Sequence, residues 1–304
     1  MSGRVPRTIG VISAFQPDEG INLAIDAVRK ICDGVIVVDD GSGSGFDAIF
    51  ESLRSRAEVI RLDTNSGIAA ALNAGVVAAR ERNAVFVFTF DQDTQPNADY
   101  ADSVFATYFQ AQAEGVRVAL VCAGLINDAR VRVAYGVGRF QAALEAPQSG
   151  FLIPMSTFDA VGLLDVNYFI DCVDTEFIFR ARQRGLATII SPEAQIAHTT
   201  GQRIIGRFGK GSIEFSYHAP LRRYYITRNR ASLFATYGSR NVKWAMRQAA
   251  SETKTAMLCI AYGPDRAKQI GAILGGIFDA VVQRRGKIRP SLDRRLSVGR
   301  AASL

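Results

Sequence analysis

The sequence has few of the residues that build metal or disulfide frameworks. Its 304 residues include 4 cysteines and 2 histidines, and no two cysteines have CxxC spacing. Cys32, Cys122, Cys172 and Cys259 are scattered among apolar neighbours. We therefore expect buried thiols in a reducing cytoplasm rather than a disulfide or a cysteine-based metal site.

Long apolar runs are missing as well. No stretch reaches the roughly 18 uninterrupted apolar residues of a membrane-spanning helix, and the first residues, MSGRVPRTIG, contain no apolar signal region. We therefore expect a cytoplasmic protein that is not exported. The hydrophobic fraction of 48% is ample for a core.

The net charge of +7 is distributed unevenly along the chain. Basic residues crowd the last stretch, where Asp293 is the single acid: Arg284, Arg285, Lys287, Arg289, Arg294, Arg295 and Arg300. Such a segment predicts contact with anionic lipid or nucleic acid, and a solvated basic tail is the alternative.

Short apolar strands alternate with amphipathic helices through the first third of the chain. The pattern predicts strands at 8–14, 35–38, 59–62 and 85–90, with helices at 21–31, 46–56 and 68–82 between them. This rhythm predicts a mostly parallel sheet with helices on both faces.

The strand within VFVFTFDQDT, residues 85–94, runs straight into Asp91 and Asp93. Two carboxylates at i and i+2 of a strand face the same side, which suits a divalent cation that carries a phosphorylated ligand. A polar strand exit before the turn at 95–97 is one alternative. A haloacid-dehalogenase-type phosphatase is another, but two βα units precede Asp91, whereas that enzyme needs the pair on its first strand.

Polar residues also follow the other predicted strands. Phe15 and Gln16 follow the first strand, and Asp39 and Asp40 follow the second. Ligands of parallel sheets bind at the carboxyl ends of the strands, so these positions predict one site together with Asp91. The glycine-rich loop at 41–45 lacks G-x-G-x-x-G spacing and follows two acids, which argues against a dinucleotide site.

Several motifs, in this order along the chain, resemble the family 2 glycosyltransferases, and within them the bacterial rhamnosyltransferases of surface-polysaccharide assembly. The motifs are Asp39-Asp40-Gly41-Ser42, NSGIAAALNAG at 65–75, Asp91-Gln92-Asp93, SGFLI at 149–153, FIDCVDTEF at 169–177 with Arg180 and Gly185, His198, and HAPLRRYYITRN at 218–229.

The resemblance implies an α/β fold of the GT-A type with a helical C-terminal extension. It places the glycosyltransferase domain at 1–230, with a nucleotide-sugar half at 1–97 and an acceptor half at 98–230. Residues 231–304 would then form the helical, basic extension.

For the donor, the resemblance implies that Asp40 accepts a hydrogen bond from the base and that Asp39 holds the loop or the ribose. The alternative for Asp40 is a capping acid at a strand-to-helix turn. The other predicted nucleotide-sugar-binding residues are Phe15, Asn65, Gly67, Asn73, Asp91 and Arg228. The small residues at 65–75 serve either a close approach to phosphate or tight helix packing on the sheet.

For the chemistry, the resemblance implies Asp91, Asp93 and His198 as ligands of Mn²⁺ or Mg²⁺, with a core histidine as the alternative for His198. Asp174 is the expected catalytic base, because an acid that opens the helix along the acceptor cleft can deprotonate a hydroxyl. Asp171 and Glu176 are its rivals. These two acids and Tyr225 are the predicted acceptor-binding residues.

The resulting hypothesis is an inverting, metal-dependent transferase that moves L-rhamnose from dTDP-L-rhamnose to a lipid-linked or glycan acceptor. A UDP-hexose or UDP-galactofuranose donor is the alternative, and so is a nucleotide-sugar-binding protein without turnover. The apolar stripe from Ile270 to Val281 predicts an interfacial helix on the inner face of an anionic membrane, or a helix packed on the catalytic domain. No nucleic-acid partner is expected.

Overall fold

The structure is a computed structural model that describes residues 7–197, 203–208 and 211–297. The chain divides into two compact units. Met1–Val166 and Val173–Thr199 form the first unit, and Asn167–Cys172 and Thr200–Leu304 form the second. The sequence placed the end of the glycosyltransferase domain at residue 230, and that limit stays a prediction.

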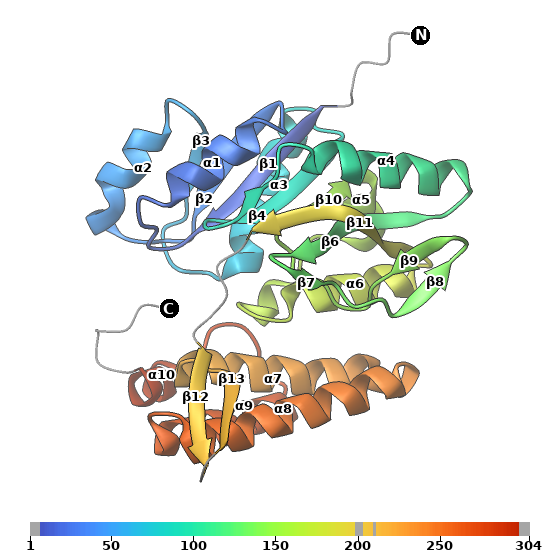
Figure 1. The fold of residues 1–304 in the computed structure, drawn as a ribbon. Coiled ribbons are helices and arrows are strands. Elements are labelled where there is room, and N and C mark those ends of the chain that lie inside the picture. The colour runs from blue at the N-terminus through green and yellow to red at the C-terminus, as the bar shows by residue number, and fades with distance from the viewer. Residues whose placement is uncertain (1–6, 198–202, 209–210, 298–304) are drawn as a thin grey trace, which may run out of the picture. The chain divides into compact units, whose positions relative to one another are not determined.

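The first unit is built on a large sheet with the strand order β3-β2-β1-β4-β10-β6-β11-β9-β8 (Figure 1). The long strands run in one direction except β10, which is antiparallel to β4 and β6, so the expected mostly parallel sheet is confirmed. The strands are β1 (Thr8–Ala14), β2 (Gly34–Asp39), β3 (Glu58–Arg61), β4 (Phe86–Asp91), β6 (Val118–Ile126), β10 (Phe151–Pro154), β11 (Ala187–Ala197) and the short β5 (Gln95–Pro96), β7 (Ala129–Arg130), β8 (Tyr135–Val137) and β9 (Phe140–Ala142).

Helices connect the strands of this sheet. They are α1 (Ile21–Arg29), α2 (Asp47–Leu53), α3 (Ile68–Glu81), α4 (Tyr100–Ala113), α5 (Met155–Val161) and α6 (Val173–Gln183), with 3-10 turns at η1 (Ser44–Phe46) and η2 (Val166–Tyr168). Every residue of β1 is buried, because helices cover both faces of the sheet there. A side chain at Gly75 of α3 would begin 2.2 Å from Val11, so the small residue lets the helix pack directly on β1.

The second unit contains a hairpin and a group of helices. The hairpin strands are β12 (Arg203–Phe208) and β13 (Gly211–Ser216), and the helices are α7 (Pro220–Tyr237), α8 (Val242–Tyr262), α9 (Arg266–Val281) and α10 (Pro290–Leu296), with a 3-10 turn at η3 (Gly238–Arg240). The helical C-terminal part is as expected, whereas the hairpin was not predicted. Within the described ranges, no helix is both long and apolar enough to cross a membrane.

A short loop, Asn167–Cys172, is held by α7 within the second unit. Phe169, Asp171 and Cys172 have φ angles of 62°, 63° and 64°, a region that residues with side chains rarely adopt. The Asn229 amide compensates by donating to the carbonyls of Tyr168, Ile170 and Asp171, at 2.7, 2.8 and 2.9 Å. Side chains of α7 therefore fix the loop, since Arg228 also donates to the Tyr168 carbonyl and Arg222 pairs with Asp171.

Candidate active site

The sheet order brings the predicted donor residues to one edge. Strands β2, β1 and β4 are neighbours, with Asp39 level with Ala14 and Asp91 level with Ser13. Their carboxyl ends are tied together, since the Phe15 amide donates to Gln92 Oε1 at 2.8 Å. The predicted convergence of polar residues at these strand ends is therefore present in the fold.

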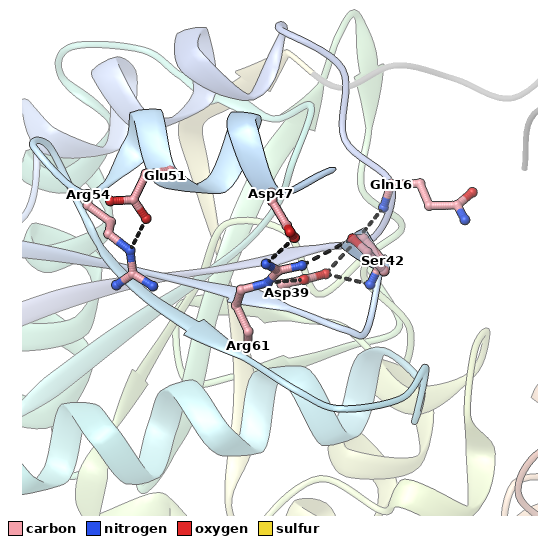
Figure 2. Close-up of polar contacts among 8 residues, drawn as sticks. Gln16, Asp39, Ser42, Asp47, Glu51, Arg54 and Arg61 are labelled. Carbon is pink, nitrogen blue, oxygen red and sulfur yellow. Dashed lines mark hydrogen bonds and ion pairs between the residues drawn. The ribbon is translucent and has the colours of Figure 1, made fainter. Parts of the chain in front are cut away.

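Asp39 is the buried centre of a polar network (Figure 2). Its Oδ1 accepts from the amide and the hydroxyl of Ser42, at 2.8 and 2.5 Å, and its Oδ2 accepts from Arg61 Nε at 2.9 Å. Ser42 Oγ in turn accepts from the Gln16 amide at 2.7 Å, which links the exits of β1 and β2. This geometry fits the expected loop-holding role of Asp39.

Arg61, the last residue of β3, holds the outer side of this network. Its guanidinium also contacts Asp47 Oδ1 at 2.6 Å and the Gly43 carbonyl at 3.2 Å. Hydrogen bonds with Asp47 and Asp39 raise the pKa of Arg61, so it stays cationic. Arg61 was not among the predicted site residues, although a basic residue at the end of a strand, next to a strand that ends in an acid, was an available signal.

Asp40 binds the loop that precedes α3. Its carboxylate accepts from the amides of Ser66 at 2.7 Å and Gly67 at 2.8 Å, where Gly67 is the N-cap of α3. Gly41, with a φ of 73°, makes this approach possible, because a Cβ there would lie 2.3 Å from the Thr64 carbonyl carbon. These contacts hold the loop before α3, whose N-cap residue makes no side-chain capping hydrogen bond, and the role of Asp40 toward the donor stays a prediction.

The prediction that Asp91 and Asp93 share one face of a strand is wrong. Strand β4 ends at Asp91, and Asp93 lies in the following turn, where the Thr94 amide donates to the Asp91 carbonyl at 3.2 Å. The strand ends because the Asp91 amide takes Ser149 Oγ as its acceptor, at 3.0 Å, instead of a strand neighbour. Both carboxylates still follow β4.

Gln148 and Ser149 position the acidic turn from the segment before β10. Gln148 Nε2 donates to Asp91 Oδ1, and Ser149 Oγ donates to Thr94 Oγ1 at 2.6 Å. Both side chains are buried. Ser149 belongs to the SGFLI motif but had no predicted role. Its contact with the Asp91 amide joins segments more than fifty residues apart, which local sequence patterns do not reveal.

The expected metal site is only partly covered by the described residues. Asp91 and Asp93 supply carboxylate oxygens, which suit Mg²⁺ and Mn²⁺. His198, the third predicted ligand, lies outside the described residues. Within residues 7–197, 203–208 and 211–297, no group of three or more His, Cys, Asp or Glu side chains has a metal-binding arrangement.

The three acids considered for the catalytic base have different environments. Asp174 is half-buried in the first turn of α6, and its Oδ1 accepts from the Thr175 amide at 2.6 Å. Glu176 is buried and paired with Arg180 at 2.8 Å. Asp171 belongs to the second unit, where it pairs with Arg222 at 3.1 Å.

Three other predicted site residues make structural contacts. Asn73 donates to and accepts from the backbone of Leu164, at 2.9 and 3.0 Å. Buried Arg228 contacts the Gly286 carbonyl at 2.5 Å. Tyr225 is buried with its ring stacked on Phe169 at 5.0 Å, and burial raises its pKa to about 12. Their roles toward donor and acceptor stay predictions.

Comparison with known proteins identifies the sheet-based part of the chain. Residues 11–144, which carry the Asp39, Asp40, Asp91 and Asp93 positions, match the model of glycosyl transferase family 2. This part of the chain therefore resembles a family 2 glycosyltransferase domain. A curated relative, the dTDP-rhamnosyl transferase RfbF of Shigella flexneri, is 27% identical over 237 residues, which is 72% of this chain and 77% of the relative. The chain is thus similar to a rhamnosyltransferase over most of its length.

Solved structures agree with this glycosyltransferase assignment at the level of the fold. The S. aureus TarS 1–349 complex with UDP has a TM-score of 0.54 at 15% identity and covers 91% of this chain and 82% of its own. GalNAc-T7 with UDP, GalNAc and Mn²⁺ has a TM-score of 0.53 at 13% identity, over 64% of this chain and 44% of its own. The expected GT-A type fold is therefore confirmed.

Proposed function

We propose that the enzyme transfers L-rhamnose from dTDP-L-rhamnose, with inversion, to a lipid-linked or polysaccharide acceptor in bacterial surface-glycan synthesis. The observation that carries this proposal is the similarity to a dTDP-rhamnosyl transferase over most of both chains. A single displacement inverts the anomeric carbon, and one general base with no second carboxylate nucleophile fits that course. The reaction would take place in the cytoplasm, where nucleotide sugars are made.

A UDP-sugar donor is the second candidate, with a hexose or galactofuranose as the sugar. It is favoured by the similarity in fold to a TarS structure that contains UDP. Uracil and thymine present the same N3–H between two carbonyls, so one carboxylate serves either base. A panel of dTDP- and UDP-sugars incubated with Mn²⁺, with release of free nucleotide as the readout, separates the candidates. If no donor releases free nucleotide, with or without an acceptor, the result would favour a nucleotide-sugar-binding protein without turnover.

Asp40 is the residue proposed to read the base. A carboxylate accepts up to about four hydrogen bonds, so holding the Ser66 and Gly67 amides is compatible with accepting one more from a base N3–H. The preceding strand keeps the group buried and fixed. Asp39 and its network would hold the neighbouring loop in place around the nucleotide.

We expect dTDP and UDP to bind more tightly than GDP or CMP, and Asp40→Ala to remove that preference. A hydrogen bond to a charged group contributes about 1.5–3 kcal/mol, so the loss for dTDP is about 10- to 150-fold. Calorimetry measures both quantities. Because Asp40 also holds the α3 loop, the ratio of dTDP to GDP affinity is the decisive value, since loosening of the loop lowers both. Preferred GDP binding by the parent, or an unchanged ratio in Asp40→Ala, would refute the assignment.

The bound metal is proposed to be Mn²⁺ or Mg²⁺, held by Asp93 and by Asp91 directly or through water. The oxygen donors fit such a cation, and Gln148 orients the Asp91 carboxylate. His198 stays the proposed third ligand, and the Mn²⁺ in the GalNAc-T7 structure supports a divalent ion. When bound, the cation would neutralise the charge of the leaving diphosphate.

Asp174 is proposed as the general base toward the acceptor hydroxyl. Glu176 and Asp171 are each held in an ion pair with an arginine, so their carboxylates already serve the fold. Asp174 lies at the start of α6, half-exposed to an approaching ligand. Glu176 would then stabilise α6 through its ion pair with Arg180, and Asp171 would stabilise its own loop through Arg222.

Arg61 is expected to position the donor loops without touching the transferred sugar. Arg61→Met removes the cation from buried Asp39 and frees the 43–47 segment, so donor affinity should fall several-fold with a lower melting temperature. Arg61→Lys should recover part of the loss because it restores the charge without the planar fork.

The matched control for Arg61 is Arg54→Met. Arg54 pairs with Glu51 at 2.9 Å (Figure 2), but both side chains are exposed, by 50% and 76%. Exposed pairs contribute little, so donor affinity and melting temperature should stay at parent values. Equal effects of the two substitutions would show that Arg61 has no special place in the donor site.

A further inference from the structure

Helix α9 has its apolar side exposed. Leu274 and Val281 are 63% and 75% exposed, and Ile270, Ile277 and Phe278 are exposed as well. The spacing of Ile270, Leu274, Ile277 and Val281 places them in one row along the helix. The buried positions are instead polar or small: Gln269, Ala272, Gly276 and Asp279. We call the exposed row, Ile270, Leu274, Ile277, Phe278 and Val281, the α9 face.

Hydrogen bonds to the polar side of α9 fix this orientation. Asp279 is fully buried and accepts from the Tyr224 hydroxyl at 2.7 Å and from Arg284 at 2.8 Å. Gln269 Nε2 donates to the His218 carbonyl at 2.8 Å. Turning the α9 face inward would bury apolar area, but it would remove Asp279 from the Tyr224 hydroxyl and Gln269 from the His218 carbonyl, and leave those buried groups without these partners.

A glycine sets how closely the polar side approaches α7. A Cβ at Gly276 would lie 2.8 Å from the Tyr224 carbonyl oxygen and 3.0 Å from the Thr227 Cβ. The helix backbones therefore meet directly at this point. Together with the buried hydrogen bonds, this contact makes the exposed α9 face a defined part of the second unit.

Basic residues stand at both ends of the α9 face. Arg266 and Lys268 lie in its first turn, and exposed Arg285 and Lys287 follow its last residue. The helix has 16 residues, about 24 Å, which is enough for one side to lie along a surface. An apolar row with cations at its ends matches the acyl boundary and the anionic headgroups of a lipid surface.

We propose that the α9 face lies on an anionic membrane surface. A second copy of the chain fits this face poorly, because two-fold pairing of the helices brings basic ends together in either direction. The net charge of +7 points the same way. This inference goes beyond the proposed transfer reaction, and it does not depend on which sugar the donor carries.

The test is co-sedimentation of the full chain with vesicles of phosphatidylcholine alone or mixed with phosphatidylglycerol. The parent should bind the anionic vesicles, and added salt should weaken binding. Leu274→Glu with Val281→Glu should abolish it. Arg266→Gln with Arg285→Gln should weaken it about 25-fold, since each basic group near the surface contributes about fivefold. Melting temperatures and dTDP binding, measured alongside, should match the parent because all four side chains are exposed.

The matched control is Leu23→Glu, at a side chain of α1 that is 59% exposed and lies outside the α9 face. Its vesicle binding should equal that of the parent. Full binding by the Leu274→Glu with Val281→Glu variant would overturn the proposal, and so would equal loss in the control. The proposal would also be overturned if the parent protein did not bind vesicles but formed dimers, and if the Leu274→Glu with Val281→Glu variant were monomeric. That result would assign the α9 face to self-association.

Discussion

Asp93→Ala is expected to abolish sugar transfer, and EDTA is expected to do the same to the parent protein. Asp93 stands in the turn after β4, beside Asp91, where a cation would meet the diphosphate. Uncompensated charge on the leaving group costs several kcal/mol, which corresponds to a loss of at least about a thousandfold in kcat. Turnover of the donor, with and without re-addition of Mn²⁺ or Mg²⁺, is the measurement.

The control for Asp93 is Asp99→Ala, which removes an exposed acid six positions further along. Turnover and Mn²⁺ affinity by calorimetry should both stay at parent values. Asp93→Ala should lose the calorimetric Mn²⁺ signal together with its activity. Full transfer activity of the parent in EDTA would contradict the metal proposal. Basic side chains would then have to neutralise the charge of the leaving diphosphate.

Asp174→Asn is expected to lower kcat by roughly 10²–10⁴ while donor and metal affinity stay unchanged. The amide keeps the shape of the side chain and loses its basicity, and that range is typical for the loss of a general base. Steady-state kinetics at saturating donor gives kcat, and calorimetry with dTDP gives the affinity.

Glu176→Gln and Asp171→Asn are the comparisons for Asp174. Each weakens an ion pair with an arginine, so the melting temperature should fall more than kcat does. Near-normal turnover in Asp174→Asn together with a collapse in Asp171→Asn would move the base three residues upstream. Loss of dTDP binding in both would show that this segment shapes the nucleotide pocket.

Local periodicity predicted the strands and helices of the first third of the chain well. The expected strand at 8–14 matches β1, and the expected helix at 68–82 differs from α3 by one residue. These segments carry an apolar pattern that matches their burial, so sequence and structure depend on the same physical cause. The antiparallel hairpin β12–β13 was not predicted from the 203–216 segment.

The hydrogen-bonding partners of the site acids could not be predicted from the sequence, because these contacts join distant segments. Asp39, Asp40 and Asp91 were visible as acids at strand ends, but their partners Arg61, Ser66 and Gln148 come from other elements. The α9 face illustrates the same limit. Its periodicity showed which residues share a side of the helix, whereas the hydrogen-bonding partners of Asp279 decided which side packs inward.

The loop Asn167–Cys172 has a consequence for how the protein is made. It precedes α6, yet its three left-handed residues depend on Asn229, which the ribosome adds more than fifty residues later. At about 5–20 residues per second, the loop waits several seconds after synthesis for the side chain that satisfies its carbonyls. During that interval the loop lacks the three hydrogen bonds from the Asn229 amide. A fragment that stops before α7 would keep this loop permanently in its unfinished state.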